Sequence, residues 1–228
     1  MRLLATLLFL PDAMSGQIPD LSSSSVSEAV EQLTGRRAHM SGDIRLIAGV
    51  RFSGPAVTMR LVRDDHASAM EAGLAAVKLI ESVPEGSVVV AALDAGKDFA
   101  VLGSTFAALA KTRKLAGFVV DGSVRDLGDL KRIAFPIFAR GVVPGTAGGH
   151  YRLDAVNVPV PCGGIEVAPG DFLFADEDGV AAAPKARYTE VIPAARKWQA
   201  DKQALLPLIE KHGAFLKAVQ ERDAARKQ

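Results

Sequence analysis

The sequence predicts an α/β fold, and three features of the chain support this prediction. Residues 87–93 form a continuous apolar run that is typical of a fully buried strand. A glycine-bearing loop, a helix over residues 105–117 and a second apolar strand at 118–122 follow, which is the spacing of a strand–helix–strand crossover. Residues 156–184 carry short β-rich pieces separated by Pro and Gly-Asp turns, and the chain from residue 185 onward is helical and charged. We therefore expect wound parallel strands, a compact β-layer and a helical tail.

Length and composition are those of one globular domain. The chain has 228 residues, of which 49% are hydrophobic and 23% are charged. We expect a single domain over residues 1–228. Its tail, residues 185–228, has too little core of its own to fold alone, so it should pack on the body or on a neighbouring subunit. The net charge of +1 gives no basic face for phosphates, so we expect no direct binding of nucleic acid.

The cysteine count and the hydropathy bear on the compartment. Cys162 is the single cysteine and can form no internal disulfide, so a reducing, cytoplasmic location is the simplest expectation. The first ten residues, MRLLATLLFL, resemble a short secretory signal, and a cleaved signal peptide is the alternative to a first helix packed on the body. No later segment has the run of about 20 apolar residues that a membrane span needs, so we expect no membrane association.

The remaining segments fit the same fold. The stretch PDLSSSSVSEAVEQLTG, residues 19–35, predicts a helix that begins in the serine cluster and ends at its last glycine. Residues 44–62 predict two strands, interrupted around Gly49 and at residues 53–55. A helix is expected over about residues 67–80.

The stretch VVDGSVRDLGDL, residues 119–130, contains the first candidate site. It predicts a buried strand that breaks at Asp121-Gly122 and then presents Arg125 and Asp126 where a helix begins. The local sequence favours a structural role, with Asp126 capping that helix and Arg125 solvated. The functional alternative is that Asp126 binds a divalent cation such as Mg²⁺, while Arg125 binds a substrate carboxylate or a developing enolate oxygen.

The stretch LGSTFAALA, residues 102–110, contains the second candidate site. Gly103 permits close approach of the backbone, and the N–H groups of Ser104, Thr105 and Phe106 would point out of a helix N-terminus toward an anion. An ordinary helix start is the structural alternative. In a crossover unit this N-terminus opens onto the same edge of the sheet as the Arg-Asp pair, so the two sites are expected to share one pocket.

Other polar residues give weaker signals. The histidines have no metal-ligand spacing; His39, His66 and His212 are expected on the surface, and His150 is a candidate for the rim of the pocket. The acidic cluster ADEDGV, residues 175–180, predicts a tight turn in preference to a metal site. The sequence carries no nucleophile motif, P-loop or dinucleotide fingerprint.

Three patches together resemble a known family. They are VLGSTFAALAKTRKLAGFVVDGSVRDLGDL, GGIEVAPGDFLFADEDGVAAAP and SVSEAVEQL, and the chain over roughly residues 22–198 is similar to the family of 4-hydroxy-4-methyl-2-oxoglutarate aldolase and the regulator of ribonuclease activity A. The resemblance implies a swivelling β/β/α fold, a homotrimer or hexamer, and a site between subunits. It places the Arg-Asp pair of the aldolase branch on Arg125 and Asp126, and the substrate-binding helix start on residues 103–106.

The resemblance also implies an activity. The aldolase branch consists of class II-type lyases that use a divalent metal, Mg²⁺ or Mn²⁺, to cleave a 4-hydroxy-2-oxo acid to pyruvate through an enolate, which predicts oxaloacetate decarboxylation as a side activity. The alternative is a non-catalytic protein that binds and regulates an RNA-processing enzyme. That branch can lack the metal-binding Asp, which this chain keeps as Asp126. An acidic residue from a neighbour's C-terminal helix also belongs to the family's site, and Asp201 is its candidate counterpart.

Overall fold

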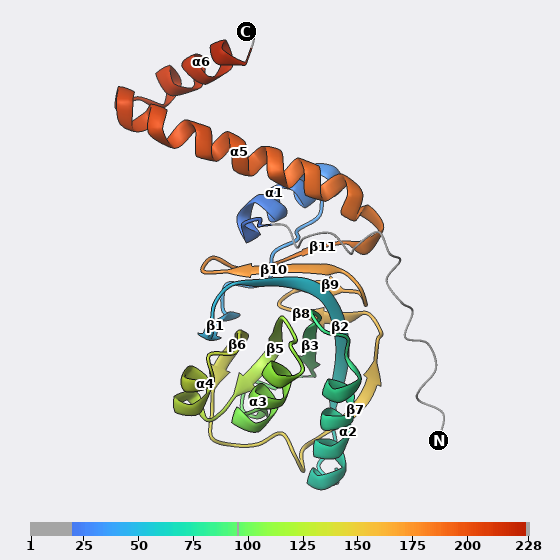
Figure 1. Ribbon diagram of the computed structural model, residues 1–228. Helices are drawn as coiled ribbons and strands as arrows, with labels where there is room; N and C mark the ends of the chain where they lie inside the picture. Colours follow the sequence, from blue (N-terminus) through green and yellow to red (C-terminus); the bar gives the residue numbers. More distant parts are fainter. Residues whose placement is uncertain (1–19, 95, 227–228) are drawn as a thin grey trace.

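The computed structural model describes residues 20–94 and 96–226 and confirms the α/β fold (Figure 1). Four strands at the centre of the sheet run parallel to one another. They are β2 (Phe52–Arg63), β3 (Val88–Leu93), β5 (Gly117–Val124) and β6 (Ile137–Val142). The first strands predicted from apolar runs, β3 and β5, are buried along nearly their whole length. Their carboxyl ends lie at one edge of the sheet, as expected for parallel strands.

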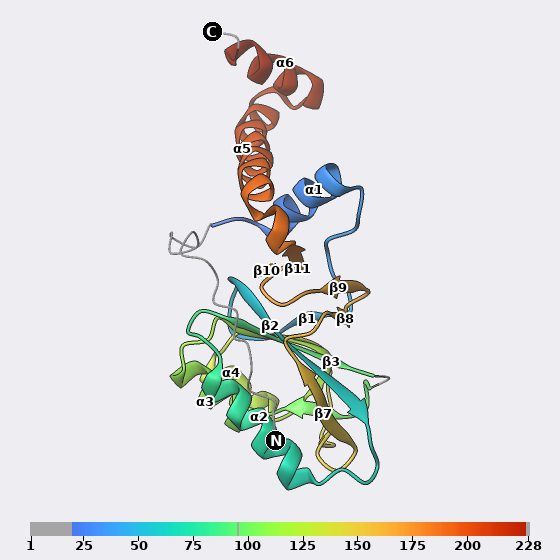
Figure 2. The same cartoon turned by 90° about the vertical axis from the view of Figure 1, so that its right-hand side faces the viewer.

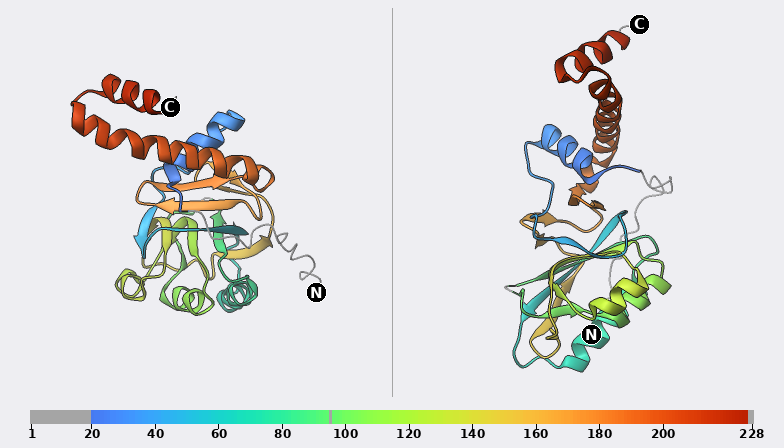
Figure 3. Two further views of the ribbon diagram at one scale, coloured as in Figure 1. Left: turned by 45° about the horizontal axis from the view of Figure 1, so that its top comes forward. Right: turned by 90° about the vertical axis from the view of Figure 1, so that its left-hand side faces the viewer.

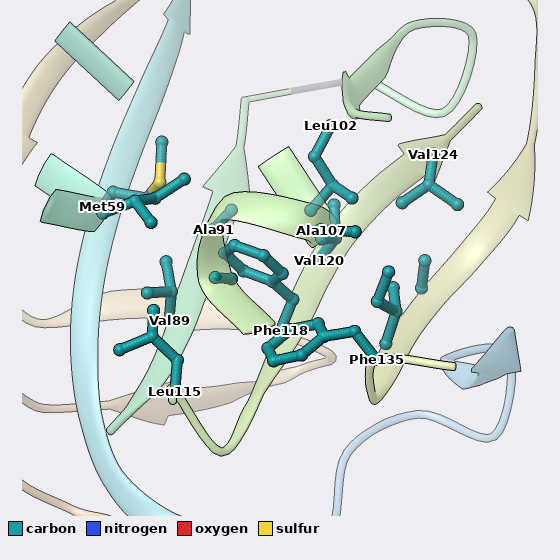
Figure 4. Close-up of a cluster of buried hydrophobic side chains, with 14 of the residues drawn as sticks. Met59, Val89, Ala91, Leu102, Ala107, Leu115, Phe118, Val120, Val124 and Phe135 are labelled. Carbon is teal, nitrogen blue, oxygen red and sulfur yellow. The ribbon is translucent and has the colours of Figure 1, made fainter. Parts of the chain in front are cut away.

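Three helices connect the parallel strands and cover one face of the sheet (Figure 3). They are α2 (Ala69–Ser82), α3 (Ser104–Thr112) and α4 (Leu127–Ile133). An apolar cluster fills the space between these helices and the sheet, with Val89, Phe118 and Phe135 buried in it (Figure 4). This packing holds α3 and α4 against the sheet, and the first residues of both helices belong to the candidate site.

Further strands, antiparallel to their partners except for β4, extend the sheet and form a second layer on its other face. The order of the large sheet is β1-β6-β5-β3-β2-β10-β11, with β4 paired to β5 and β7 paired to β2. A separate small sheet is formed by β8 and β9. A second apolar cluster, which includes Phe138 and Leu173, lies between the parallel strands and this β-layer. The added strands are β1 (Arg45–Ala48), β4 (Ala100–Leu102), β7 (Tyr151–Val156), β8 (Val160–Cys162), β9 (Ile165–Val167), β10 (Phe172–Asp176) and β11 (Gly179–Ala183).

An outer helical layer covers β10 and β11 (Figures 1 and 2). The helix α1 (Ser23–Thr34) lies beside α5 (Tyr188–His212), and a short turn then leads to α6 (Phe215–Ala225). The helical tail predicted from residue 185 is therefore confirmed, and the first part of α5 packs on the body as expected. The layers of the chain are thus helices, parallel sheet, β-layer and outer helices, which is the β/β/α arrangement with additional helices.

Two predicted interruptions are wrong because strand pairing continues through them. Strand β5 does not break at Asp121-Gly122, since Asp121 pairs with β3 and an irregularity against β6 between Val120 and Ser123 accommodates the extra residue. Strand β2 likewise runs through residues 53–55, which pair with β10. Both continuities depend on strands that come from other parts of the chain, so the local sequence did not indicate them.

The described chain begins just before α1. Ser22 caps this helix by accepting a hydrogen bond from the backbone of Ser25, and Gly35 ends it in the left-handed region at φ 67°. The two alternatives for residues 1–10, a secretory signal or a first helix, concern residues outside the described range. Across residues 20–94 and 96–226, every helix is too short or too polar to cross a bilayer.

Candidate active site

Arg125 and Asp126 lie where β5 ends and α4 begins, at the edge of the sheet where the parallel strands end. Asp126 adopts the left-handed conformation, with φ 62° and ψ 41°. That conformation costs most L-residues about 1–2 kcal/mol, and Asp and Asn tolerate it best. The chain therefore turns from strand to helix at Asp126, and both charged side chains stand at the carboxyl end of the strand.

The carboxylate of Asp126 does not cap its own helix. Its Oδ2 atom accepts two hydrogen bonds from Ser104, one from the backbone amide at 3.0 Å and one from the hydroxyl at 3.1 Å. The structural alternative, in which Asp126 caps α4, is therefore wrong. The amide bond from Ser104, assisted by its hydroxyl and by the charge of Arg125, lowers the pKa of Asp126 against the opposing effect of burial. The carboxylate is consequently ionised at neutral pH.

Gly103 packs directly against the Arg-Asp pair. A Cβ atom at Gly103 would lie 2.4 Å from Oδ2 of Asp126 and 3.1 Å from Cγ of Arg125. The backbone of Gly103 is extended, with φ −135° and ψ −161°, so its conformation does not demand glycine. Glycine is required here because there is no room for a side chain between the start of α3 and the carboxylate of Asp126. The prediction that Gly103 permits close approach is confirmed.

The first amide of α3 binds an anionic group of this chain, the carboxylate of Asp126. The amide of Ser104 donates to Asp126, whereas the amides of Thr105 and Phe106 have no hydrogen-bond partner in the described part of the chain. These two amides lie in the first turn of the helix, where the helix dipole favours negative charge. Of the three amides expected to face an external anion, two remain available.

Arg125 and Asp126 line a pocket of about 340 Å³, together with Val142, Val143 and Pro144 from the end of β6 and the loop after it. None of residues 103–106 is among its lining residues, so the helix start reaches this pocket only through the bond from Ser104 to Asp126. The backbone of Arg125 is fixed, because its amide donates to Leu102 at 3.0 Å. Within residues 20–94 and 96–226, its guanidinium makes no hydrogen bond or ion pair within contact distance. The half-buried guanidinium of Arg125 therefore faces the pocket beside the carboxylate of Asp126, with all its N–H groups free to bind a ligand.

The histidines do not belong to this pocket. His150, the candidate for its rim, lies with Nδ1 3.5 Å from Asp65 and with its ring packed at a tilt of 36° against Phe99, the two centroids being 4.5 Å apart. It is not among the residues that line the pocket. His39 and His66 are exposed, as predicted.

The remaining acidic candidates also lie elsewhere. Asp176 accepts hydrogen bonds from the backbone of Asp178 at 3.1 Å and from the backbone of Ser23 at 2.7 Å, so the acidic cluster forms the predicted turn and also holds the start of α1. Asp201 in α5 forms an ion pair with Arg226 of its own chain. Neither residue approaches Asp126 within this chain, and the role of Asp201 toward a neighbouring subunit stays a prediction.

Strands β5 and β6 also carry a charged network that the local sequence does not indicate. Arg140 of β6 forms ion pairs with Asp121 of β5 and with Asp43. Asp121 also accepts from the amide of Gly163 at 2.7 Å, and Asp43 lies 3.2 Å from the ammonium of Lys97. The local sequence predicts a turn at Asp121, whereas this residue lies within β5, next to β6. The network joins the β8–β9 hairpin and two loops to the edge of the sheet.

The donor set at Asp126 suits a hard divalent cation. While Oδ2 is bound to Ser104, Oδ1 has no hydrogen-bond partner in the described residues. Mg²⁺ typically keeps several waters and takes only one or two protein carboxylates. In the described part of the chain there is no cluster of three or more His, Cys, Asp or Glu side chains, so a cation here would be held by Asp126 and waters and not by a closed protein cage.

Comparison with known proteins decides the family. The family model described as RraA-like, Aldolase/RraA, matches residues 23–182. The chain belongs to this RraA-like family. The matched range contains both the start of α3 and the Arg125-Asp126 pair, so the geometry described above lies within the part that defines the family.

Individual relatives agree with this assignment. The chain is 34% identical over 191 residues, 82% of this chain and 84% of the other, to a protein of Halalkalibacterium halodurans provisionally named 4-hydroxy-4-methyl-2-oxoglutarate aldolase. A crystal structure of an uncharacterised protein from Pseudomonas syringae pv. tomato has 27% identity and a TM-score of 0.79, and the match covers 89% of this RraA-like chain and 90% of that one. A Streptomyces coelicolor protein, described as an unusual member of the RNase ES inhibitor RraA family, has 28% identity and a TM-score of 0.70 over 80% and 92% of the two chains.

Proposed function

We propose that the protein is a divalent-metal-dependent, class II-type carbon–carbon lyase that cleaves a 4-hydroxy-2-oxo acid, similar to 4-hydroxy-4-methyl-2-oxoglutarate, to pyruvate. The observation that carries the proposal is the placement of Arg125 and Asp126 in one pocket, with Asp126 bound to the first amide of α3. The names of aldolase relatives support the reaction class. Mg²⁺ or Mn²⁺ is the proposed cofactor, because one carboxylate with free coordination suits these ions.

Each residue has a distinct part in this reaction. Asp126 would hold the metal, which when bound supplies Lewis acidity toward the carboxylate and keto oxygens of the substrate. The amides of Thr105 and Phe106 would anchor an anionic group of the substrate at the helix start. Val142 and Val143 add apolar side chains to the lining of the pocket.

Arg125 would stabilise the charge that develops during cleavage. The hydroxyl proton on C4 leaves, C4 becomes a carbonyl, and the electron pair of the C3–C4 bond passes to the pyruvyl fragment as an enolate. A fixed guanidinium beside the enolate oxygen stabilises that charge. Protonation of the enolate carbon then gives pyruvate. Decarboxylation of oxaloacetate passes through the same enolate, so we expect it as a side activity.

The first test is pyruvate release, coupled to lactate dehydrogenase, from 4-hydroxy-4-methyl-2-oxoglutarate and from oxaloacetate, with Mg²⁺, Mn²⁺ or a chelator. The matched variant is Asp126→Asn, because Asn tolerates the left-handed conformation and its amide oxygen can still accept from Ser104. It should keep the fold and lose turnover by about 10³-fold or more, since a neutral ligand holds the metal weakly. Activity close to that of the wild type in Asp126→Asn and Asp126→Ala would refute the metal site.

A second variant tests the role of the Arg125 guanidinium. Arg125→Lys keeps the positive charge and loses the planar pair of donors, so we expect kcat/KM to fall by about 10²-fold or more. The guanidinium has no partner in the described part of the chain whose loss would destabilise the fold, so the urea midpoint should not change. An unchanged kcat/KM would show that Arg125 does not bind the substrate.

The proposal includes a homotrimer or hexamer with the site completed at a subunit contact. Large apolar side chains on α5 and α6 are exposed in the single chain, with exposed fractions of 57% for Leu206 and 74% for Leu216. Such residues support an interface between subunits. Light scattering of the purified protein gives the number of chains, and a monomer at micromolar concentration would contradict this part of the proposal.

The alternative function is a non-catalytic protein that binds and regulates an RNA-processing enzyme. The similarity to the Streptomyces coelicolor protein, which is described as a member of the RNase ES inhibitor RraA family, supports this alternative. It predicts no pyruvate from either compound with any metal, together with inhibition of an RNase E-type nuclease in a cleavage assay. Turnover that requires metal and vanishes in Asp126→Asn would decide for the lyase.

A further inference from the structure

We propose that Ser104 is a positioning residue for the metal site: it binds one oxygen of the Asp126 carboxylate through both its amide and its hydroxyl, and so leaves the other oxygen for the cation. This inference rests on the proposed function. It assigns Ser104 to the carboxylate and not to the anionic group of the substrate, for which the sequence had suggested it.

The two hydrogen bonds from Ser104 select between the carboxylate oxygens. Both donors converge on Oδ2, at 3.0 Å and 3.1 Å, and Oδ1 receives no hydrogen bond from any described residue. Two donors on one oxygen restrict rotation of the carboxylate about its last torsion angle. The lone pairs of Oδ1 therefore remain available, and partners of this kind typically change metal affinity by about 10–100-fold when they are removed.

The surrounding backbone makes Ser104 the residue that orients this side chain. Asp126 makes no hydrogen bond to the helix that it precedes, so its own helix does not fix the carboxylate. Gly103 leaves the space that Oδ2 occupies free, since a Cβ atom added there would lie 2.4 Å from it. Ser104 and Asp126 lie in different strand–helix–strand units. The hydrogen bonds between them therefore also connect the start of α3 to the end of β5.

Ser104 is the first residue of α3, which permits an unusual pair of substitutions. Ser104→Ala removes the hydroxyl and keeps the amide. Ser104→Pro removes both donors and suits the first position of a helix. Its Cδ atom would also take the place of the amide hydrogen that points at Oδ2, 3.0 Å from the nitrogen, so it displaces the carboxylate as well, and Ser104→Ala is the deciding variant. Gly103 is extended, with φ −135° and ψ −161°, and it has no Cβ to clash with a following proline ring. Ser104→Thr keeps both donors and serves as the conservative rescue.

The experiment is titration of the full-length wild type and each variant with Mn²⁺ alone, followed by electron paramagnetic resonance, without substrate. We expect the Kd for Mn²⁺ to rise about 5–10-fold in Ser104→Ala and about 100-fold in Ser104→Pro, and to stay within about twofold of the wild type in Ser104→Thr. Thr112→Ala is the matched control, because its hydroxyl lies on the same helix and donates only to the carbonyl of Ala108. Its Kd should equal that of the wild type.

The outcomes separate this inference from the proposed function. If Asp126→Ala abolishes Mn²⁺ binding while Ser104→Ala and Ser104→Pro bind as the wild type does, the metal site stands and the role of Ser104 is refuted. If Asp126→Ala binds Mn²⁺ as the wild type does, or the wild type binds none, the metal site and this inference both fail. Circular dichroism identifies a variant that has not folded, and Ser104→Ala decides the matter if Ser104→Pro is such a variant.

Discussion

Substitution of Gly103 by alanine offers a stringent test of the site, because the structure predicts a large loss of activity with a small loss of stability. The new Cβ would lie 2.4 Å from Oδ2 of Asp126. An ordinary contact between carbon and oxygen is about 3.3 Å or more, so the carboxylate must move by about 1 Å. The backbone of Gly103 can adopt its extended conformation as alanine, so the effect is one of space.

The magnitude follows from what this movement disrupts. The two hydrogen bonds from Ser104, now 3.0 Å and 3.1 Å long, would be lost or lengthened. Asp126 is exposed, so water replaces much of their contribution, and we expect a loss of about 1 kcal/mol in the free energy of unfolding. A displacement of about 1 Å in a catalytic group can cost about 100-fold in rate, so kcat/KM should fall by at least that factor.

The assay pairs pyruvate release with unfolding in urea. Gly73→Ala in α2 is the matched control, because an added Cβ there meets no atom within 4 Å. A glycine in a helix interior is less favourable than alanine by about 1 kcal/mol, so the control should gain stability and keep its rate. Wild-type kcat/KM in Gly103→Ala would refute the argument that the close approach of α3 positions the carboxylate.

Two further predictions concern stability. Asp176→Ala removes the acceptor for the amide and hydroxyl of Ser23, at 2.7 Å and 2.5 Å, so the free energy of unfolding in urea should fall by about 1–2 kcal/mol; a loss below the error of the measurement would contradict this role. The pKa of Asp43 is held far below its usual value by Ser41 and then by Lys97 and Arg140. Because the folded state depresses this pKa, the stabilisation is present above about pH 4 and is lost as the pH falls. The stability difference between wild type and Asp43→Asn, measured by urea titration, should therefore shrink from pH 7 toward pH 2, and a constant difference would contradict it.

The sequence predicted the parts of the fold that depend on local pattern. The apolar runs that became β3 and β5 and the crossover through α3 needed only periodicity and turn residues. The same crossover placed the start of α3 and the Arg-Asp pair at one edge of the sheet, which the structure confirms. The resemblance to the aldolase and ribonuclease-regulator family supplied the β/β/α fold, and the comparisons confirm it.

Features that depend on distant partners were not predictable in this way. The hydrogen bonds from Ser104 join residues 22 positions apart, and no local signal distinguishes an Asp that caps its own helix from one bound by another helix. Asp121 and Arg140 form an ion pair because β5 and β6 lie side by side, whereas the local Asp-Gly sequence predicted a turn. Pairing overrode turn propensity at that position.

The long strand β2 has a consequence for how the chain folds. Its first residues pair with β10, Pro55 lying opposite Phe172, and the residues that follow pair with β3, Ala56 lying opposite Val88. The second pairing closes a short loop and the first closes a much longer one, so the parallel layer should form before the β-layer docks on it. In the folded protein β2 belongs to both layers, so unfolding of one layer removes the pairing partner of the other. The two layers should therefore unfold in one cooperative transition, and native-state hydrogen exchange should give the central residues of β2 the same opening free energy as those of β10.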